Sequence, residues 1–221
     1  MADQNQKMTD QKAQPTRAPA FQTNRLEAFS DGVFAIAITL LVLEVAVPAG
    51  SEDDLLGAVL HEWPSYLAYL VSFSTVGAVW IGHAVITEFL ERATPLIIRL
   101  NLVLLMVVSF LPFPTRLLAE YIGEDAPERV AATIYGLNLF LAAILVSLLW
   151  RYAVREGLIR SDISDKTVKT ITKRLTPGLA GYLIMILLGL FLPLLAVIGY
   201  LVIAVYNMVP IRDLRRSKAS A

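Results

Sequence analysis

Ionisable and hydrogen-bonding side chains lie at the ends of apolar segments, where a bilayer would make such groups costly. They are Arg25, Ser30, Asp31, Trp80, His83 and Asn101. An ionisable side chain at the centre of a membrane costs about 2.5–3.5 kcal/mol on insertion scales, so it is retained where it pairs or lines water. We expect this set to meet near one membrane boundary, with Asp31 kept ionised beside Arg25. Such a polar network would clamp the first three helices together.

Single members of this set also have simpler interpretations. Arg25 is compatible with a basic anchor whose long side chain reaches the membrane interface. Asp31 is compatible with an acidic residue that complements a helix dipole. Trp80 alone most often indicates an interfacial aromatic, and His83 alone a structural histidine. The set is informative because it spans three helices on one side of the membrane.

A second pattern on the first apolar segment consists of bulky aliphatic residues. Ile36, Leu40 and Leu43 follow one another at i, i+4 and i+7, which places them on one stripe of a helix. Asp31 lies roughly 140° from Ile36 around the same helix, at 100° per residue. The polar network and the aliphatic stripe therefore face different neighbours. Spacing alone favours contact of this stripe with lipid or with another helix.

The elements that position these residues are predicted to be six transmembrane helices in an all-α, polytopic membrane protein. The chain is 56% hydrophobic and has a mean hydropathy of +0.61. An average globular domain contains about 45–50% apolar residues. Spans of roughly 17–25 apolar residues are required. They are expected at about residues 28–47, 66–89, 96–118 and 130–152, and twice within 177–210, where Pro193 marks a turn.

The distribution of charge sets the predicted topology, because cytoplasmic loops collect Lys and Arg. Alternate loops then hold nearly all of the 19 basic residues, so both termini are expected in the cytoplasm. We expect a disordered tail at 1–24, a six-helix transmembrane bundle at 25–211 with a charged helix or linker at 152–175, and a basic tail at 212–221.

Composition also argues against several classes of function. The 19 basic and 19 acidic residues balance, so no nucleic-acid partner is expected. The sequence has no cysteine and two distant histidines, so we expect neither a metal site nor a cofactor. A membrane-embedded enzyme would need a nucleophile with a base, or a metal set. Neither pattern is present in the sequence, and we expect no enzyme.

The run Arg25-x-x-x-Phe29-Ser30-Asp31 closely resembles the signature of the transmembrane protein 175 family. Further matches are Trp80-x-x-His83, Asn101 and the run Pro112-Phe-Pro-Thr. The resemblance is strong over residues 25–118 and looser beyond them. These proteins are potassium channels of animal endosomes and lysosomes, with shorter bacterial homologues.

The resemblance implies that first helices of four subunits surround the ion path in a homotetramer, here in a bacterial plasma membrane. Family members place large aliphatic residues at the constriction, which implies Ile36, Leu40 and Leu43 here. A hydroxyl linked to ion preference in the family falls on Thr39. The implied function is a potassium-favouring cation channel with potassium as the permeant ion.

The alternative is a proton-coupled ion transporter that uses Asp31 and His83 as a relay. The sequence shows no inverted repeat and no broken helix at the middle of the membrane, both of which are common in such transporters.

Overall fold

A computed structural model describes residues 23–47 and 49–209. Pro48, the predicted tail at 212–221 and residues 1–22 of the predicted tail at 1–24 lie outside the described residues. Every named secondary-structure element within these ranges is a helix or a 3₁₀ turn. They are α2 (Thr23–Leu40), the 3₁₀ turns η1 (Leu41–Glu44) and η2 (Glu52–Asp54), α3 (Leu55–His61), α4 (Trp63–Phe89), α5 (Pro95–Ser109), α6 (Pro112–Tyr121), α7 (Asp125–Arg155), α8 (Asp165–Gly189) and α9 (Pro193–Met208).

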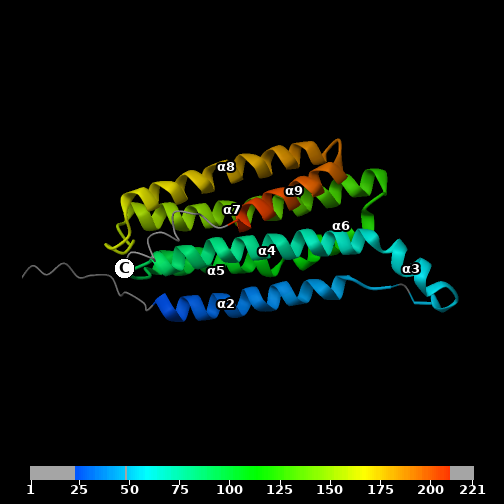
Figure 1. The fold of residues 1–221 in the computed structure, drawn as a ribbon, viewed down its shortest axis with the longest axis horizontal. Coiled ribbons are helices and arrows are strands. Elements are labelled where there is room, and N and C mark those ends of the chain that lie inside the picture. The colour runs from blue at the N-terminus through cyan, green and yellow to red at the C-terminus, as the bar shows by residue number, and fades with distance from the viewer. Residues whose placement is uncertain (1–22, 48, 210–221) are drawn as a thin grey trace, which may run out of the picture.

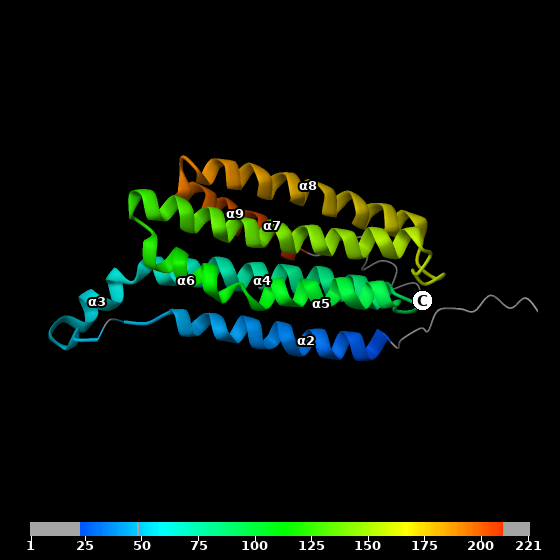
Figure 2. The ribbon, with the colours of Figure 1, turned by 180° about the vertical axis from the view of Figure 1, so that it is seen from behind.

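The long helices lie side by side along one axis and form an elongated bundle. Two opposite views place α2 along one edge and α8 along the other, with α4 and α5 between α2 and the remaining helices (Figures 1 and 2). α2 packs on α4 and α5, whereas α8 packs on α7 and α9. Among the described helices, one side of α2 therefore has no neighbour.

Five helical segments are long and apolar enough to cross a membrane, by length and composition. The protein is thus a multi-pass membrane protein, as predicted. The last helix, α9, is apolar but has only 16 residues, about 24 Å at 1.5 Å per residue. This is just below the usual lower limit of about 17 residues for a span. Six crossings therefore stay a prediction.

The third predicted span is divided into two helices beside Pro112 and Pro114. α5 ends at Ser109 and α6 begins at Pro112. A proline has no backbone N–H and is tolerated in the first turn of a helix, where that group needs no partner within the helix. The interruption, at residues 110–111, lies about nine residues beyond Asn101 along the span, so it does not disturb the polar network.

The charged segment expected at 152–175 is mostly helical, and the connection itself is shorter. α7 continues to Arg155, and α8 begins at Asp165 because the Ser164 hydroxyl accepts a hydrogen bond from the backbone N–H of Thr167 at 3.2 Å. Ile171 is buried on α8, and Val168 and Leu175 pack against the core on the same stripe. The fifth predicted span is therefore a 25-residue helix and is longer than expected.

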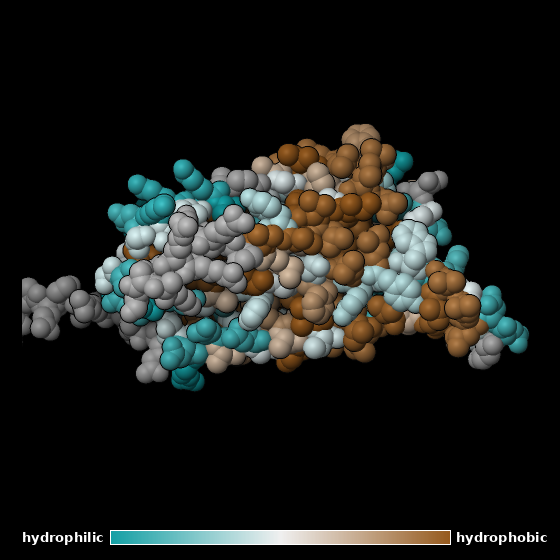
Figure 3. Space-filling view, in the orientation of Figure 1, coloured by the Kyte–Doolittle hydropathy of each residue, from teal (hydrophilic) through white to brown (hydrophobic). Residues whose placement is uncertain are grey.

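The two ends of the bundle differ in charge. The end that carries the start of α2 and the connection from α7 to α8 holds Arg25, Arg155, Arg160, Lys166 and Lys169, and we call it the basic end. The opposite end, beside α3, holds Glu52, Asp53, Asp54 and Glu62, and we call it the acidic end. Between them, the visible face is largely apolar (Figure 3), as expected for a surface in contact with lipid.

Candidate functional site

One side of α2 is anchored in the subunit by small and aromatic residues at helical spacing. Ser30, Phe34, Ala37 and Leu41 follow at i, i+4, i+7 and i+11, and each is at most 3% exposed. Residues at this spacing share one face of a helix. This face meets α4 and α5, the two helices against which α2 packs.

The other side of α2 carries the predicted aliphatic stripe. Ile36 is 61% exposed, Leu40 is 42% exposed and Leu43 is 69% exposed in the single subunit. Leu43 lies in the 3₁₀ turn η1, so the stripe crosses the junction between α2 and that turn. Three such side chains in a row form a surface suited to lipid or to a second protein chain.

Thr39 lies on this exposed side, between Ile36 and Leu40. Its hydroxyl donates to the backbone carbonyls of Ala35 and Ile36, at 3.0 and 2.9 Å. The hydroxyl proton is therefore committed to the helix itself, and the Oγ1 lone pairs are the part of the side chain that remains available to an outside group.

A chain of hydrogen bonds joins three helices on the anchored side. His83 Nε2 on α4 lies 2.7 Å from Asn101 Oδ1 on α5. Asn101 Nδ2 donates to Ser30 Oγ on α2 at 2.9 Å, and Ser30 Oγ donates to the carbonyl of Leu26 at 2.7 Å. Because an amide oxygen only accepts, His83 Nε2 must carry the proton that it shares with Asn101.

The imidazole of His83 has one polar atom outside this chain. His83 is 1% exposed, and its Nδ1 has no hydrogen-bond partner among the described residues. Its ring lies 5.4 Å from the ring of Phe34, between centroids. An imidazole with a bare, buried Nδ1 is a potential proton acceptor.

Asp31 has a different partner from the one the sequence suggested. Its carboxylate accepts a hydrogen bond from Trp80 Nε1 at 2.8 Å, whereas Arg25 is exposed and forms no ion pair among the residues described. The predicted proximity of Arg25 and Asp31 is wrong because positions six residues apart lie about 120° apart on a helix. Phe29 is also outside the network, at 56% exposure.

The structure thus brings Ser30, His83 and Asn101 together, and pairs Asp31 with Trp80 beside them. Trp80 and His83 lie three residues apart on α4 and so face α2 from the same side. Within the described ranges, no group of three or more His, Cys, Asp or Glu side chains is arranged to hold a metal ion. The hydrogen bonds of the network join α2, α4 and α5.

Sequence reasoning missed a second polar cluster deeper in the bundle. Ser72 Oγ on α4 lies 2.7 Å from Thr115 Oγ1 on α6 and 3.0 Å from the Tyr135 hydroxyl on α7. The Tyr200 ring on α9 packs 5.7 Å from that of Tyr135. The available signal was the presence of polar residues in the middle of apolar spans. The partners of Ser72, however, lie 43 and 63 residues away from it in the chain.

Comparison with known proteins places this arrangement in a family. The family model described as "Endosomal/lysosomal potassium channel TMEM175" matches residues 25–112, which include all three helices of the polar network. A potassium channel of Streptomyces collinus is 38% identical over 195 residues, which cover 86% of this chain and 95% of the relative. The chain belongs to the TMEM175 family.

Other members of the TMEM175 family extend this result. A potassium channel of Chamaesiphon minutus is 43% identical over 84% of this chain and 93% of its own length. The crystal structure of a lysosomal potassium-selective channel TMEM175 homologue from that organism superimposes with a TM-score of 0.77 at 39% identity, covering 88% of this chain and 97% of that one. The resemblance seen in the sequence is confirmed, and the family consists of ion channels, not enzymes.

Animal relatives carry a different name. An endosomal/lysosomal proton channel TMEM175 of Gallus gallus is 34% identical over 139 residues, which cover 59% of this chain but 28% of the relative. The bacterial relatives named above match this chain over nearly their whole length.

Proposed function

We propose that the protein is a potassium-favouring cation channel in which α2 helices of four subunits surround the ion path. The observation that carries this proposal is the two-sided character of α2. Ile36, Leu40 and Leu43 lie on a side that has no neighbour in the subunit, while the opposite side is fixed by the hydrogen bonds of Ser30. A rigidly held helix with a bulky apolar free side is suited to line a symmetry axis.

The proposed constriction consists of rings of these aliphatic side chains. Rings of branched side chains gate by dewetting, because an ion cannot shed its hydration shell between them without compensation. A small rotation or splay of the four helices would widen the rings enough to pass a partly hydrated cation. Thr39 Oγ1, on the same side, would offer oxygen lone pairs to the passing ion.

The proposed topology has six spans with both termini in the cytoplasm of a bacterial cell. The basic end of the bundle is assigned to the cytoplasm by the positive-inside rule. The carboxylates of Asp53 and Asp54 at the acidic end would then lie outside, where their field would enrich cations near the mouth. In this arrangement α9 returns the chain to the cytoplasmic side.

The decisive experiment measures ion flux in liposomes that contain the purified protein. With potassium on one side and sodium on the other, the reversal potential should follow the potassium gradient. A sodium flux as large as the potassium flux would contradict a preference for potassium. No flux above that of empty liposomes would contradict the channel itself.

Substitution of Leu40 by Ala tests the constriction. Leu40→Ala should raise potassium flux and weaken the preference for potassium over sodium, because the ring would become wider and easier to wet. The matched control is Leu187→Ala on α8, at the opposite edge of the bundle and 55% exposed. If Leu40→Ala and Leu43→Ala both conduct like the parent protein, the stripe is not the constriction.

The bare Nδ1 of His83 is the one observation that favours proton transport as a second candidate. The proposed relay through Asp31 receives less support, since Asp31 bonds Trp80 while His83 bonds Asn101. A flux that saturates at low ion concentration and follows a pH gradient would favour this alternative. A reversal potential that ignores the pH gradient would exclude it.

A further inference from the structure

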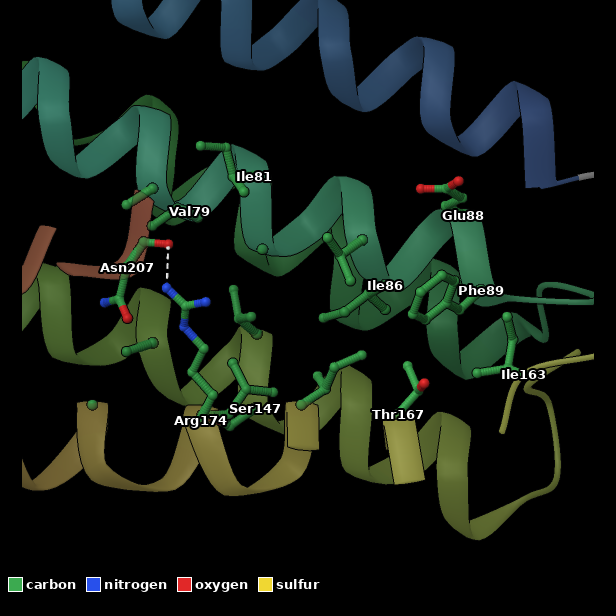
Figure 4. Close-up of a pocket in the computed structure, with 18 of the residues that line it drawn as sticks. Val79, Ile81, Ile86, Glu88, Phe89, Ser147, Ile163, Thr167, Arg174 and Asn207 are labelled. Atoms are coloured by element: carbon green, nitrogen blue, oxygen red, sulfur yellow. Dashed lines mark hydrogen bonds between the residues drawn. The ribbon is translucent and has the colours of Figure 1, made fainter. Parts of the chain in front are cut away.

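A cavity of about 650 Å³ lies inside the subunit, between α4, α7, α8 and α9 (Figure 4). It belongs to no part of α2 or of the polar network described above. It exists because α9 is short: α4 and α8 both pack on α9, but α9 ends at Met208, before it reaches the basic end. Beyond that residue, α4, α7 and α8 line the cavity, and no further described helix lies between them.

The walls of this cavity are mostly apolar and its size suits a small molecule. Val79, Val85 and Ile86 of α4 and Ile171 of α8 are among its lining residues. Its volume falls within the roughly 300–1,000 Å³ of ordinary ligand sites. Gly178 lies in the α8 wall, and a Cβ atom there would meet nothing within 4 Å. An apolar occupant therefore has room.

One basic side chain enters the cavity from α8. The Arg174 guanidinium reaches towards the end of α9 (Figure 4), where its Nη2 donates to the carbonyls of Tyr206 at 2.8 Å and Asn207 at 3.3 Å, and to that of Val209. It also lies 5.5 Å from the centre of the Tyr206 ring. These hydrogen bonds all use Nη2, so Nε and Nη1 have no hydrogen-bond partner among the described residues.

The charge of Arg174 is not balanced by a carboxylate within the described ranges. The one ion pair found there joins Arg160 and Asp162 at 2.6 Å, at the edge of the same cavity. The hydrogen bond from Arg160 lowers the pKa of Asp162, so the charges of these two residues cancel each other at neutral pH. Glu88 also borders the cavity, but at the end distant from Arg174 (Figure 4).

We propose that an anionic phospholipid from the leaflet at the basic end binds this cavity, with one acyl chain along its apolar wall and its phosphate at Arg174. Arginine presents a planar set of donors that matches phosphate oxygens. Arg174 lies nine residues into α8, about 13 Å from the helix start, at a depth suited to a headgroup. Basic pockets between helices on the cytoplasmic side bind anionic headgroups in other membrane proteins.

The charge of the chain's own C-terminal segment makes a lipid the better occupant of the cavity. The eleven residues that follow Pro210 carry four basic side chains, one acidic side chain and two large apolar ones: Arg212, Arg215, Arg216 and Lys218, then Asp213, then Ile211 and Leu214. The net positive charge of this segment disfavours its placement beside Arg174.

Native mass spectrometry of the full-length protein in detergent tests the proposal, with phosphatidylglycerol, phosphatidylcholine and inorganic phosphate as separate probes. Phosphatidylglycerol should bind in preference to the other two. Arg174→Gln should weaken its binding by roughly 10–100-fold, the range expected for loss of a hydrogen bond to a charged group. The control Arg155→Gln removes an exposed charge from the end of α7 and should leave binding unchanged.

A second variant fills the cavity without touching Arg174. Gly178→Leu should remove phosphatidylglycerol binding, whereas Ala180→Leu, which places the same leucine side chain at an exposed position of α8, should not. Unchanged binding in Gly178→Leu, or equal binding of phosphatidylcholine, would overturn the proposal. So would a gain of binding only after removal of residues 211–221, which would identify the C-terminal segment as the occupant. The measurement needs no ion flux, so its outcome is separate from the test of channel activity.

Discussion

At the scale of single residues, the position of α2 depends on a few buried hydrogen bonds. Ser30 and Asn101 are at most 1% exposed, and each bonds a group on another helix. In a membrane, apolar side chains gain little by leaving lipid for a neighbouring helix, so packing and hydrogen bonds between helices carry much of the specificity. Ser30 is small enough to bring α2 close to α5 and polar enough to accept from Asn101.

Replacing Ser30 by Ala should lower the stability of the protein in detergent. The change leaves the buried Nδ2 of Asn101 without its acceptor, at a cost of about 1 kcal/mol for a hydrogen bond between membrane helices. The thermal midpoint should fall by about 2–4 °C for a chain of this size. Ser161→Ala, in the exposed connection between α7 and α8, makes the same chemical change and serves as the control. Equal midpoints for the two variants would refute a role for this bond.

At the scale of elements, α9 decides both the topology and the shape of the subunit. It is shorter than the helices around it, it closes the core with Ala196, Val197 and Tyr200, and its early end opens the cavity at Arg174. The same helix determines whether the C-terminus returns to the side of the N-terminus.

Cysteine labelling tests whether α9 crosses the membrane, since the natural chain has no cysteine. With an impermeant maleimide, Ser161→Cys and Ser217→Cys should react from the cytoplasmic side of vesicles, and Phe191→Cys, in the turn between α8 and α9, from the other side. Ala49→Cys, near the acidic end, is the control for the outer side. Reaction of Ser217→Cys and Phe191→Cys from one common side would show five crossings instead of six.

At the scale of the whole molecule, the surface of one subunit is incomplete as a channel. The apolar stripe of α2 lies at the edge of the bundle and encloses nothing by itself (Figure 1). Copies related by a symmetry axis would place the stripes opposite one another, and closed rings of this kind are the common form of homo-oligomers.

The assembly is therefore expected to have four times the chain mass of 24.3 kDa. Light scattering with correction for bound detergent measures this quantity directly. Arg174→Gln, on α8 at the opposite edge of the bundle from α2, should leave the mass unchanged and serves as the control. A stable monomer that still conducts ions would contradict an axial path between subunits.

The sequence by itself determined the features that repeat along a single helix. The apolar spans follow from segment length, and the separation of Ile36, Leu40 and Leu43 from the anchored side of α2 follows from a period of 3.6 residues. The Arg25-to-Asp31 signature, with Trp80 and His83, was specific enough to indicate the family.

The tertiary structure alone decided which side chains meet. Helical period fixes the direction of a residue but not the sliding or rotation of one helix against another, and a shift of a single turn changes every partner. This is why Ser30, and not Arg25, proved to be the group on α2 that Asn101 contacts. For the same reason the cavity at Arg174 could not be foreseen: it depends on where α9 stops relative to α4 and α8, which no local pattern records.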